Sequence, residues 1–273
     1  MRAPRLLLVW AATADALAGS VQAKGLRGLQ VPSHGLSPLP HGSLDIDAPG
    51  WGRGYGTGAQ VWPAAASLAR WVAANVAPAE DASLEDRLVV KPAADRPVEE
   101  NGIPLLRNSS VLELGSGTGA LGLWVGAALG AGRVTLTDKA LKSLRQGNIE
   151  RNRHLFPNSA DVRDVDFAFG DDTSDIRGHD VILASDVTYD DAAHAALVRT
   201  LAELLADGAP LALLAHQHRP VASVLGGRSV LRHFEAAAAA GGLSLETVWT
   251  EAPFGDFGRI DVMRISLART IIT

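Results

Sequence analysis

The sequence predicts an α/β domain in which helices cover both faces of a mainly parallel sheet. From residue 111 onward, short apolar segments of strand length alternate with longer segments of helical periodicity. Several of the apolar segments end at glycines or at an acid. Alternation of this kind requires right-handed crossovers, which place helices on both sides of the sheet. With 273 residues, the chain has room for one such doubly wound domain plus additional segments.

The individual elements follow from apolar periodicity and from residues that begin or end helices. Strands are predicted at Val111–Leu114, Val134–Thr137, Val162–Phe169, Val181–Ala184, Pro210–Ala215, Leu243–Trp249 and Val262–Leu267. Helices are predicted at Ala120–Leu129, Ala140–Leu155, Asp191–Ala206 and Val230–Ala240. A further helix begins near Pro63, because proline suits the first helical position. Leu68 and Trp71 continue its apolar stripe at helical spacing.

Three zones divide the chain. Residues 1–43 are predicted to be an N-terminal tail, residues 44–110 a helical cap with an acidic insertion, and residues 111–273 the main domain. Within the tail, two arginines precede the apolar run Leu6–Ala12. This pattern is typical of a signal or transit segment, and a disordered tail explains it equally well. Localisation therefore stays open between the cytoplasm and an organelle.

Composition excludes several classes of protein. A formal net charge of -5 without a run of Lys or Arg argues against a general nucleic-acid binder. The absence of cysteine excludes disulfides, zinc–thiolate sites and a cysteine nucleophile. Since no stretch is long and apolar enough to cross a bilayer, we expect no membrane span. We expect a monomer.

A glycine-rich loop after the first strand is predicted to hold a ligand. Glu113 precedes the run from Gly115 to Gly119, and glycines there let the backbone approach a ligand closely. Gly115, Gly117 and Ala120 also fit the dinucleotide pattern. Glu113 favours a ligand with a methionine moiety over a dinucleotide, because a carboxylate attracts the methionine amino group and repels a pyrophosphate. Alternatively, Glu113 is a structural acid that caps the following turn.

The next two strands indicate a nucleoside. Asp138 ends the second strand, where a carboxylate can accept hydrogen bonds from both ribose hydroxyls of an adenosine. NAD and S-adenosylmethionine share that ribose, so Asp138 does not choose between them. Phe167 or Phe169 would flank the adenine, although phenylalanines in strands usually belong to the core.

The fourth strand ends in Ser185, Asp186 and, three residues further on, Tyr189. An acid and a phenol at this edge of the sheet are expected to face the position where a group to be transferred would lie. If the acceptor is a lysine amine, Asp186 would orient it and Tyr189 would hydrogen-bond it or form the wall of the channel. The alternative makes Asp186 the N-terminal cap of the next helix and Tyr189 a packing residue.

These motifs together resemble protein methyltransferase family 16, the lysine methyltransferases related to the Hsp70, valosin-containing-protein and elongation-factor modifiers. The resemblance covers roughly residues 58–250 and rests on Val61–Ala65, Val111–Gly119, Asp138 and Asp186-x-x-Tyr189. Asn148, Asn152 and, more weakly, Arg219 also fit. It implies a Rossmann-like, seven-strand class I methyltransferase sheet with an N-terminal extension.

The resemblance also implies S-adenosylmethionine as cofactor and an unidentified protein as partner. The implied cofactor site consists of Trp62, the loop Gly115–Ser116–Gly117, Asp138, an aromatic after the third strand, and Ser185. Asp186 and Tyr189 would border the acceptor. The family commonly has tryptophan after its third strand, whereas this chain offers Phe167 and Phe169.

Our leading hypothesis is methyl transfer from S-adenosylmethionine to a protein lysine. A histidine or a small-molecule amine would require little change in the acceptor pocket. An NAD-dependent oxidoreductase and a non-catalytic assembly factor that binds S-adenosylmethionine are the alternatives. His216 and His218 offer two imidazoles but no evident third ligand, so no metal site is predicted.

Overall fold

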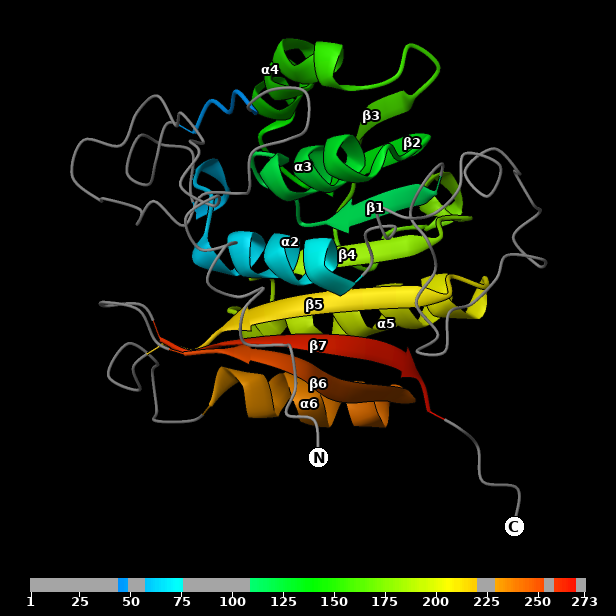
Figure 1. Ribbon diagram of the computed structural model, residues 1–273. Helices are drawn as coiled ribbons and strands as arrows, with labels where there is room; N and C mark the ends of the chain where they lie inside the picture. The colour runs from blue at the N-terminus through cyan, green and yellow to red at the C-terminus, as the bar shows by residue number, and fades with distance from the viewer. Residues whose placement is uncertain (1–43, 49–56, 76–108, 220–228, 253–257, 269–273) are drawn as a thin grey trace, which may run out of the picture.

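The molecule is a three-layer α/β domain (Figure 1). The computed structural model describes residues 44–48, 57–75, 109–219, 229–252 and 258–268. The predicted tail at 1–43 and the acidic insertion, predicted at 81–102, lie outside the described residues. In the described part of the chain, no helix has the length and apolar character that crossing a bilayer requires.

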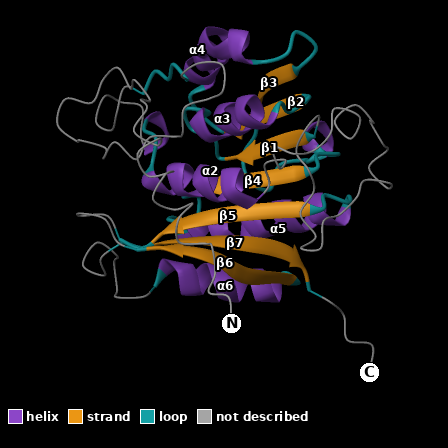
Figure 2. Ribbon diagram, viewed as in Figure 1, coloured by secondary structure: helices purple, strands orange, loops and turns teal. Residues whose placement is uncertain are grey.

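Seven strands form one sheet in the order β3-β2-β1-β4-β5-β7-β6 (Figure 2). Their bounds are β1 Ser110–Leu114, β2 Arg133–Asp138, β3 Asp161–Asp166, β4 Val181–Ser185, β5 Leu211–Gln217, β6 Leu243–Glu251 and β7 Ile260–Leu267. The first five strands pair in parallel, whereas β7 runs antiparallel to both β5 and β6. The α/β architecture predicted from the sequence is confirmed.

Five α-helices of the described chain flank this sheet. They are α2 Pro63–Asn75, α3 Ala120–Leu129, α4 Lys142–Asn152, α5 His194–Ala206 and α6 Val230–Ala240. Figure 1 shows α2, α3 and α4 on one face, with α5 and α6 on the other. The predicted bounds of α3 and α6 agree with the structure, and α2 begins at Pro63 as expected.

Strand alternation divides the apolar residues between two cores. Val111 packs with α2 and α3, while its neighbour Leu112 packs with α5 and α6 on the opposite face. Leu183 and Ile182 divide in the same way on β4. Successive side chains of a strand point to opposite faces, so a strand covered on both sides is apolar throughout. In β1 and β4, every residue except one terminal serine is therefore buried.

Two of the predicted boundaries that differ from the structure lie beside the cavity, and local turns explain both. The third strand ends at Asp166 rather than at Phe169. The amide N–H of Ala168 donates to the Asp171 carboxylate at 2.8 Å and closes a turn there. Phe167 and Phe169 consequently lie in the loop beyond the strand. The following helix α4 begins at Lys142 rather than at Ala140, because Leu141 has a left-handed φ of 62°.

Two buried asparagines of α4 attach the segment Leu44–Ala48 to the domain. The Asn152 side chain accepts from the Asp45 N–H at 2.8 Å and donates to the Asp45 carbonyl at 2.7 Å. Asn148 pairs with the Asp47 backbone in the same manner, at 2.8 and 3.2 Å. Each side-chain amide thus bonds the backbone N–H and C=O of one residue, as a neighbouring strand would. We call these two asparagines the asparagine clamp. Leu44 and Ile46 of that segment are buried in the core.

Replacing Asn152 by alanine is expected to lower the free energy of unfolding by about 1–3 kcal/mol, because the paired Asp45 backbone groups lose their partner. Urea denaturation measures the effect. Asn158→Ala is the matched control, since Asn158 is exposed. Equal unfolding midpoints for the two variants would contradict a stabilising role for the clamp.

Candidate functional site

A cavity of about 530 Å³ lies at the carboxyl ends of the parallel strands. The strand order reverses between β1 and β4, and ligands of such sheets bind at this switch point. Register places the ends of the two strands side by side, with Leu114 opposite Ala184. The structure brings all eleven residues predicted for the site to this cavity, namely Trp62, Glu113, Gly115, Ser116, Gly117, Asp138, Phe167, Phe169, Ser185, Asp186 and Tyr189.

The loop after β1 has a backbone that requires glycine. Gly117 has a φ of 52°, and a Cβ there would lie 2.5 Å from the Gly58 carbonyl oxygen. Gly115 has a φ of 65°, and its Cβ would lie 2.7 Å from the Val187 side chain. The loop therefore packs tightly against neighbouring chain segments and presents its backbone to the cavity.

Glu113 is buried beneath this loop, with 3% of the residue exposed. Its Oε2 accepts from the Gly122 N–H of α3 at 2.8 Å. A side chain at position 122 would collide with the same oxygen, since its Cβ would lie 2.7 Å away. Burial raises the pKa of Glu113 to about 8, opposed mainly by the Gly122 hydrogen bond. The predicted structural contact is present, and the residue also lines the cavity.

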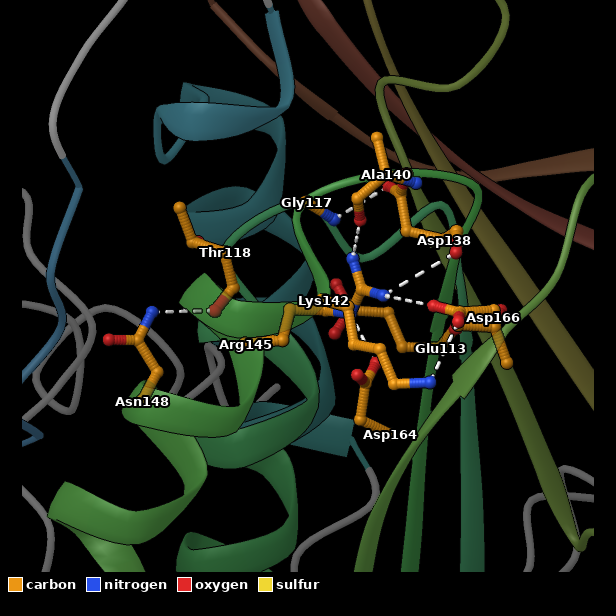
Figure 3. Close-up of polar contacts among 11 residues, drawn as sticks. Glu113, Gly117, Thr118, Asp138, Ala140, Lys142, Arg145, Asn148, Asp164 and Asp166 are labelled. Atoms are coloured by element: carbon orange, nitrogen blue, oxygen red, sulfur yellow. Dashed lines mark hydrogen bonds and ion pairs between the residues drawn. The ribbon is translucent and has the colours of Figure 1, made fainter. Parts of the chain in front are cut away.

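Asp138 ends β2 with both carboxylate oxygens fixed by backbone (Figure 3). One oxygen accepts from the Gly117 N–H at 3.0 Å and the other from the Ala140 N–H at 2.9 Å. Each carboxylate oxygen keeps a second lone pair, so these contacts leave acceptor capacity toward the cavity. Asp138 is thereby held against the glycine loop.

Arg145 supports the turn that carries Asp138, and the sequence did not indicate it. This fully buried guanidinium donates to the Ala140 carbonyl, pairs with Asp164, and contacts the Asp138 carbonyl at 3.4 Å. Figure 3 shows it between the turn and the end of β3. An arginine in a polar helical segment is ordinarily expected to be exposed to solvent. The sequence pattern therefore did not predict that Arg145 is buried.

The Asp186 carboxylate forms an ion pair with the Arg219 guanidinium. Arg219 Nη1 donates to one oxygen at 3.0 Å, and Nη2 donates to the other. Asp186 has a left-handed φ of 54°, and its N–H donates to the Ala215 carbonyl at 2.8 Å. Burial raises the pKa of Asp186, and the Arg219 guanidinium opposes the shift. The alternative role as a helix cap is wrong, because Asp190 caps the following helical turn.

Two aromatic side chains, Tyr189 and Trp62, line the same cavity as Asp186. Tyr189 is 51% exposed, so it is not a core packing residue. The Arg219 guanidinium carbon lies 5.4 Å from the centroid of the Trp62 ring. Gln60 also lines the cavity, without a sequence signal that pointed to it.

His216 and His218 bind other protein groups. His216 Nδ1 is 2.7 Å from the Thr188 hydroxyl, and His218 Nε2 is 2.6 Å from the Asp261 carboxylate. Burial lowers the pKa of His216 to about 4, so this imidazole is neutral near pH 7. Among the described residues, no group of three metal-ligating side chains gathers around them.

The cavity suits a nucleoside joined to an amino acid. Asp138 offers acceptors for ribose hydroxyls, Glu113 offers one for an ammonium, and two phenylalanines offer apolar faces. Ser116 Oγ is buried without a hydrogen-bond partner among the described residues, so it can bond a polar ligand. These residues fit S-adenosylmethionine.

The strand order, with β7 inserted antiparallel between β5 and β6, defines the class I methyltransferase fold. A family model described as lysine methyltransferase matches residues 44–224. The chain belongs to this lysine methyltransferase family, and its cofactor is S-adenosylmethionine. The family assignment decides against NAD.

Individual proteins similar to this chain have low sequence identity to it. The protein N-terminal and lysine N-methyltransferase EFM7 of Yarrowia lipolytica is 28% identical over 145 residues, which cover 45% of this chain and 52% of the relative. The match thus spans about half of that relative. Among solved structures, a TehB-like methyltransferase from Corynebacterium glutamicum has 20% identity and a TM-score of 0.39, covering 59% of this chain and 81% of the other. NodS of Bradyrhizobium japonicum has 13% identity and a TM-score of 0.45, covering 60% and 80%.

Binding of S-adenosylhomocysteine at pH 7 is expected to release up to about one proton. Glu113 is largely protonated in the free protein, and a neighbouring ammonium favours the carboxylate and lowers its pKa. Affinity should therefore rise with pH until about 8. Titration calorimetry in buffers of different ionisation enthalpy measures the release. Glu113→Gln should abolish it, and binding without proton release by the unaltered protein would contradict this role.

Arg145→Met is expected to weaken S-adenosylhomocysteine binding about tenfold, or about 1.4 kcal/mol, because the Asp138 turn loses its support. Combining it with Asp138→Ala should add little to the loss of the Asp138 variant, since Arg145 acts through Asp138. Lys142→Met is the matched control, because Lys142 pairs with Asp166 at 2.7 Å through side chains that are exposed. Parental affinity in Arg145→Met, or full additivity in the double variant, would refute the positioning role.

Proposed function

We propose that this protein transfers a methyl group from S-adenosylmethionine to the side-chain amine of a lysine in another protein. The observation that carries the proposal is the lysine methyltransferase match over residues 44–224, which includes the acid and the phenol at the end of β4. Asp186 and Tyr189 line the same cavity as the glycine loop. The acceptor would enter beside Tyr189, whose ring is exposed at the cavity.

The residues of the first two strands would bind the cofactor. Asp138 would accept hydrogen bonds from the ribose hydroxyls, and Glu113 would accept from the methionine amino group. Ser116 Oγ, which is buried and unbonded among the described residues, would gain a partner. Phe167 or Phe169 would pack against the adenine. Bound S-adenosylmethionine supplies a methyl group on a positively charged sulfur.

The acceptor lysine must lose its proton, because only the neutral amine has a lone pair for attack. Burial in an apolar pocket favours the neutral form. Nitrogen then forms a bond to the methyl carbon as the carbon–sulfur bond breaks, leaving S-adenosylhomocysteine. Asp186 would orient the amine and Tyr189 would hydrogen-bond it or confine it. Much of the rate would come from such positioning.

A protein N-terminal amine is a second candidate acceptor. The name of the Yarrowia relative includes N-terminal as well as lysine methylation. Both acceptors are primary amines, so one pocket can serve either. Product analysis separates them, because a modified lysine and a modified N-terminus lie on different peptides.

Incubating the full chain with a cell lysate and methyl-deuterated S-adenosylmethionine is expected to place labelled methyl groups on lysines of a small number of proteins, detected by peptide mass spectrometry. Asp138→Ala should lose both labelling and S-adenosylhomocysteine binding, whereas Asp186→Asn should lose labelling and keep binding. Parental cofactor binding with no labelled peptide would indicate a non-catalytic binding protein instead.

A further inference from the structure

The chain places one of its own cations in front of the acid that would receive the acceptor. Arg219 follows β5 by two residues, and its guanidinium donates to both oxygens of Asp186. With Arg219 in place, 2% of the Asp186 side chain is exposed. A second cation therefore has no access to this carboxylate while the pair is intact.

Asp186 and Trp62 together form a cation subsite. A buried carboxylate supplies charge, and the face of an indole attracts a cation within about 6 Å of its centroid. The Arg219 guanidinium satisfies both conditions, at 3.0 Å from the carboxylate and 5.4 Å from the ring centroid. Both subsite residues also line the cofactor cavity, so the subsite lies beside the predicted reaction centre.

Arg219 can leave this subsite without unfolding its surroundings. The backbone before it is fixed, since the His218 N–H donates to the Arg259 carbonyl at 2.8 Å. The Arg219 side chain itself is 30% exposed. A rotation about side-chain bonds therefore moves the guanidinium to solvent and opens the Asp186 carboxyl group to another cation. A buried carboxylate that loses its partner is costly, so a replacement cation is strongly favoured.

We propose that Arg219 is an internal occupant of the acceptor's cation subsite, and that a lysine ammonium enters by exchanging with it. This inference rests on the proposed function. The exchange makes Arg219 a specificity-determining residue: a free alkylamine competes poorly with a tethered guanidinium, whereas a lysine held by a docked protein has a high local concentration. After the exchange the ammonium passes its proton to the Asp186 carboxylate, and the neutral amine then attacks the methyl group.

The experiment measures binding of n-butylammonium chloride to the full chain saturated with S-adenosylhomocysteine, by titration calorimetry at matched chloride concentration. Arg219→Ala opens the subsite and should bind the probe at least about tenfold more tightly than the unaltered protein, or about 1.4 kcal/mol. Arg219→Ala combined with Asp186→Asn should lose this gain. Arg232→Ala, which removes an exposed arginine of α6, should behave as the unaltered protein.

The outcomes separate this inference from the proposed function. Normal S-adenosylhomocysteine binding with equal probe affinity in the unaltered protein and Arg219→Ala would overturn only the exchange. Loss of S-adenosylhomocysteine binding in Arg219→Ala alone would also overturn it, because Arg219 would then belong to the cofactor site. Failure of the unaltered protein to bind S-adenosylhomocysteine would refute the proposed function itself. If Arg219→Ala does not fold, Arg219→Gln removes the charge while keeping the length of the side chain, and the same criteria apply.

Discussion

The register between β1 and β4 is the constraint on which the site depends. These two buried strands pair in parallel and end at the same level, so the loops after Leu114 and after Ser185 open on the same side of the sheet. β2 ends beside them because Leu114 also pairs with Thr137. A shift by one residue would turn each strand's core side chains to the opposite face. The fit of particular side chains into the two cores therefore fixes where the glycine loop, Asp138 and Asp186 meet.

Charges inside this domain are arranged in two ways. Arg145 is fully enclosed and holds a turn, with Asp164 as its partner. Arg219 is partly open to solvent and covers an acid that the proposed reaction would need. Enclosed pairs are costly to break, and the loss of one partner leaves an uncompensated charge. The first pair is therefore suited to fixing geometry, whereas the exposure of Arg219 allows the second pair to exchange.

Much of the fold and the cavity lining could be predicted from the sequence, because both depend on local patterns. Apolar periodicity gave the strands, and glycine requirements marked the loop after β1. Contacts between distant segments could not be predicted from local patterns. The burial of Arg145 depends on Asp164 of β3, and the ion pair of Asp186 depends on Arg219, which follows β5. The end of β3 was misplaced because the apolar alternation continues through Phe169, while the turn is set by Asp171.

The asparagine clamp has a consequence for synthesis of the chain on the ribosome. Asp45 is bonded to a residue 107 positions later, so its segment has no native partner until α4 has been made. At typical elongation rates this interval is on the order of ten seconds. During that time Leu44 and Ile46 lack the core residues that bury them in the folded domain. The segment can therefore be buried only after α4 has been synthesised.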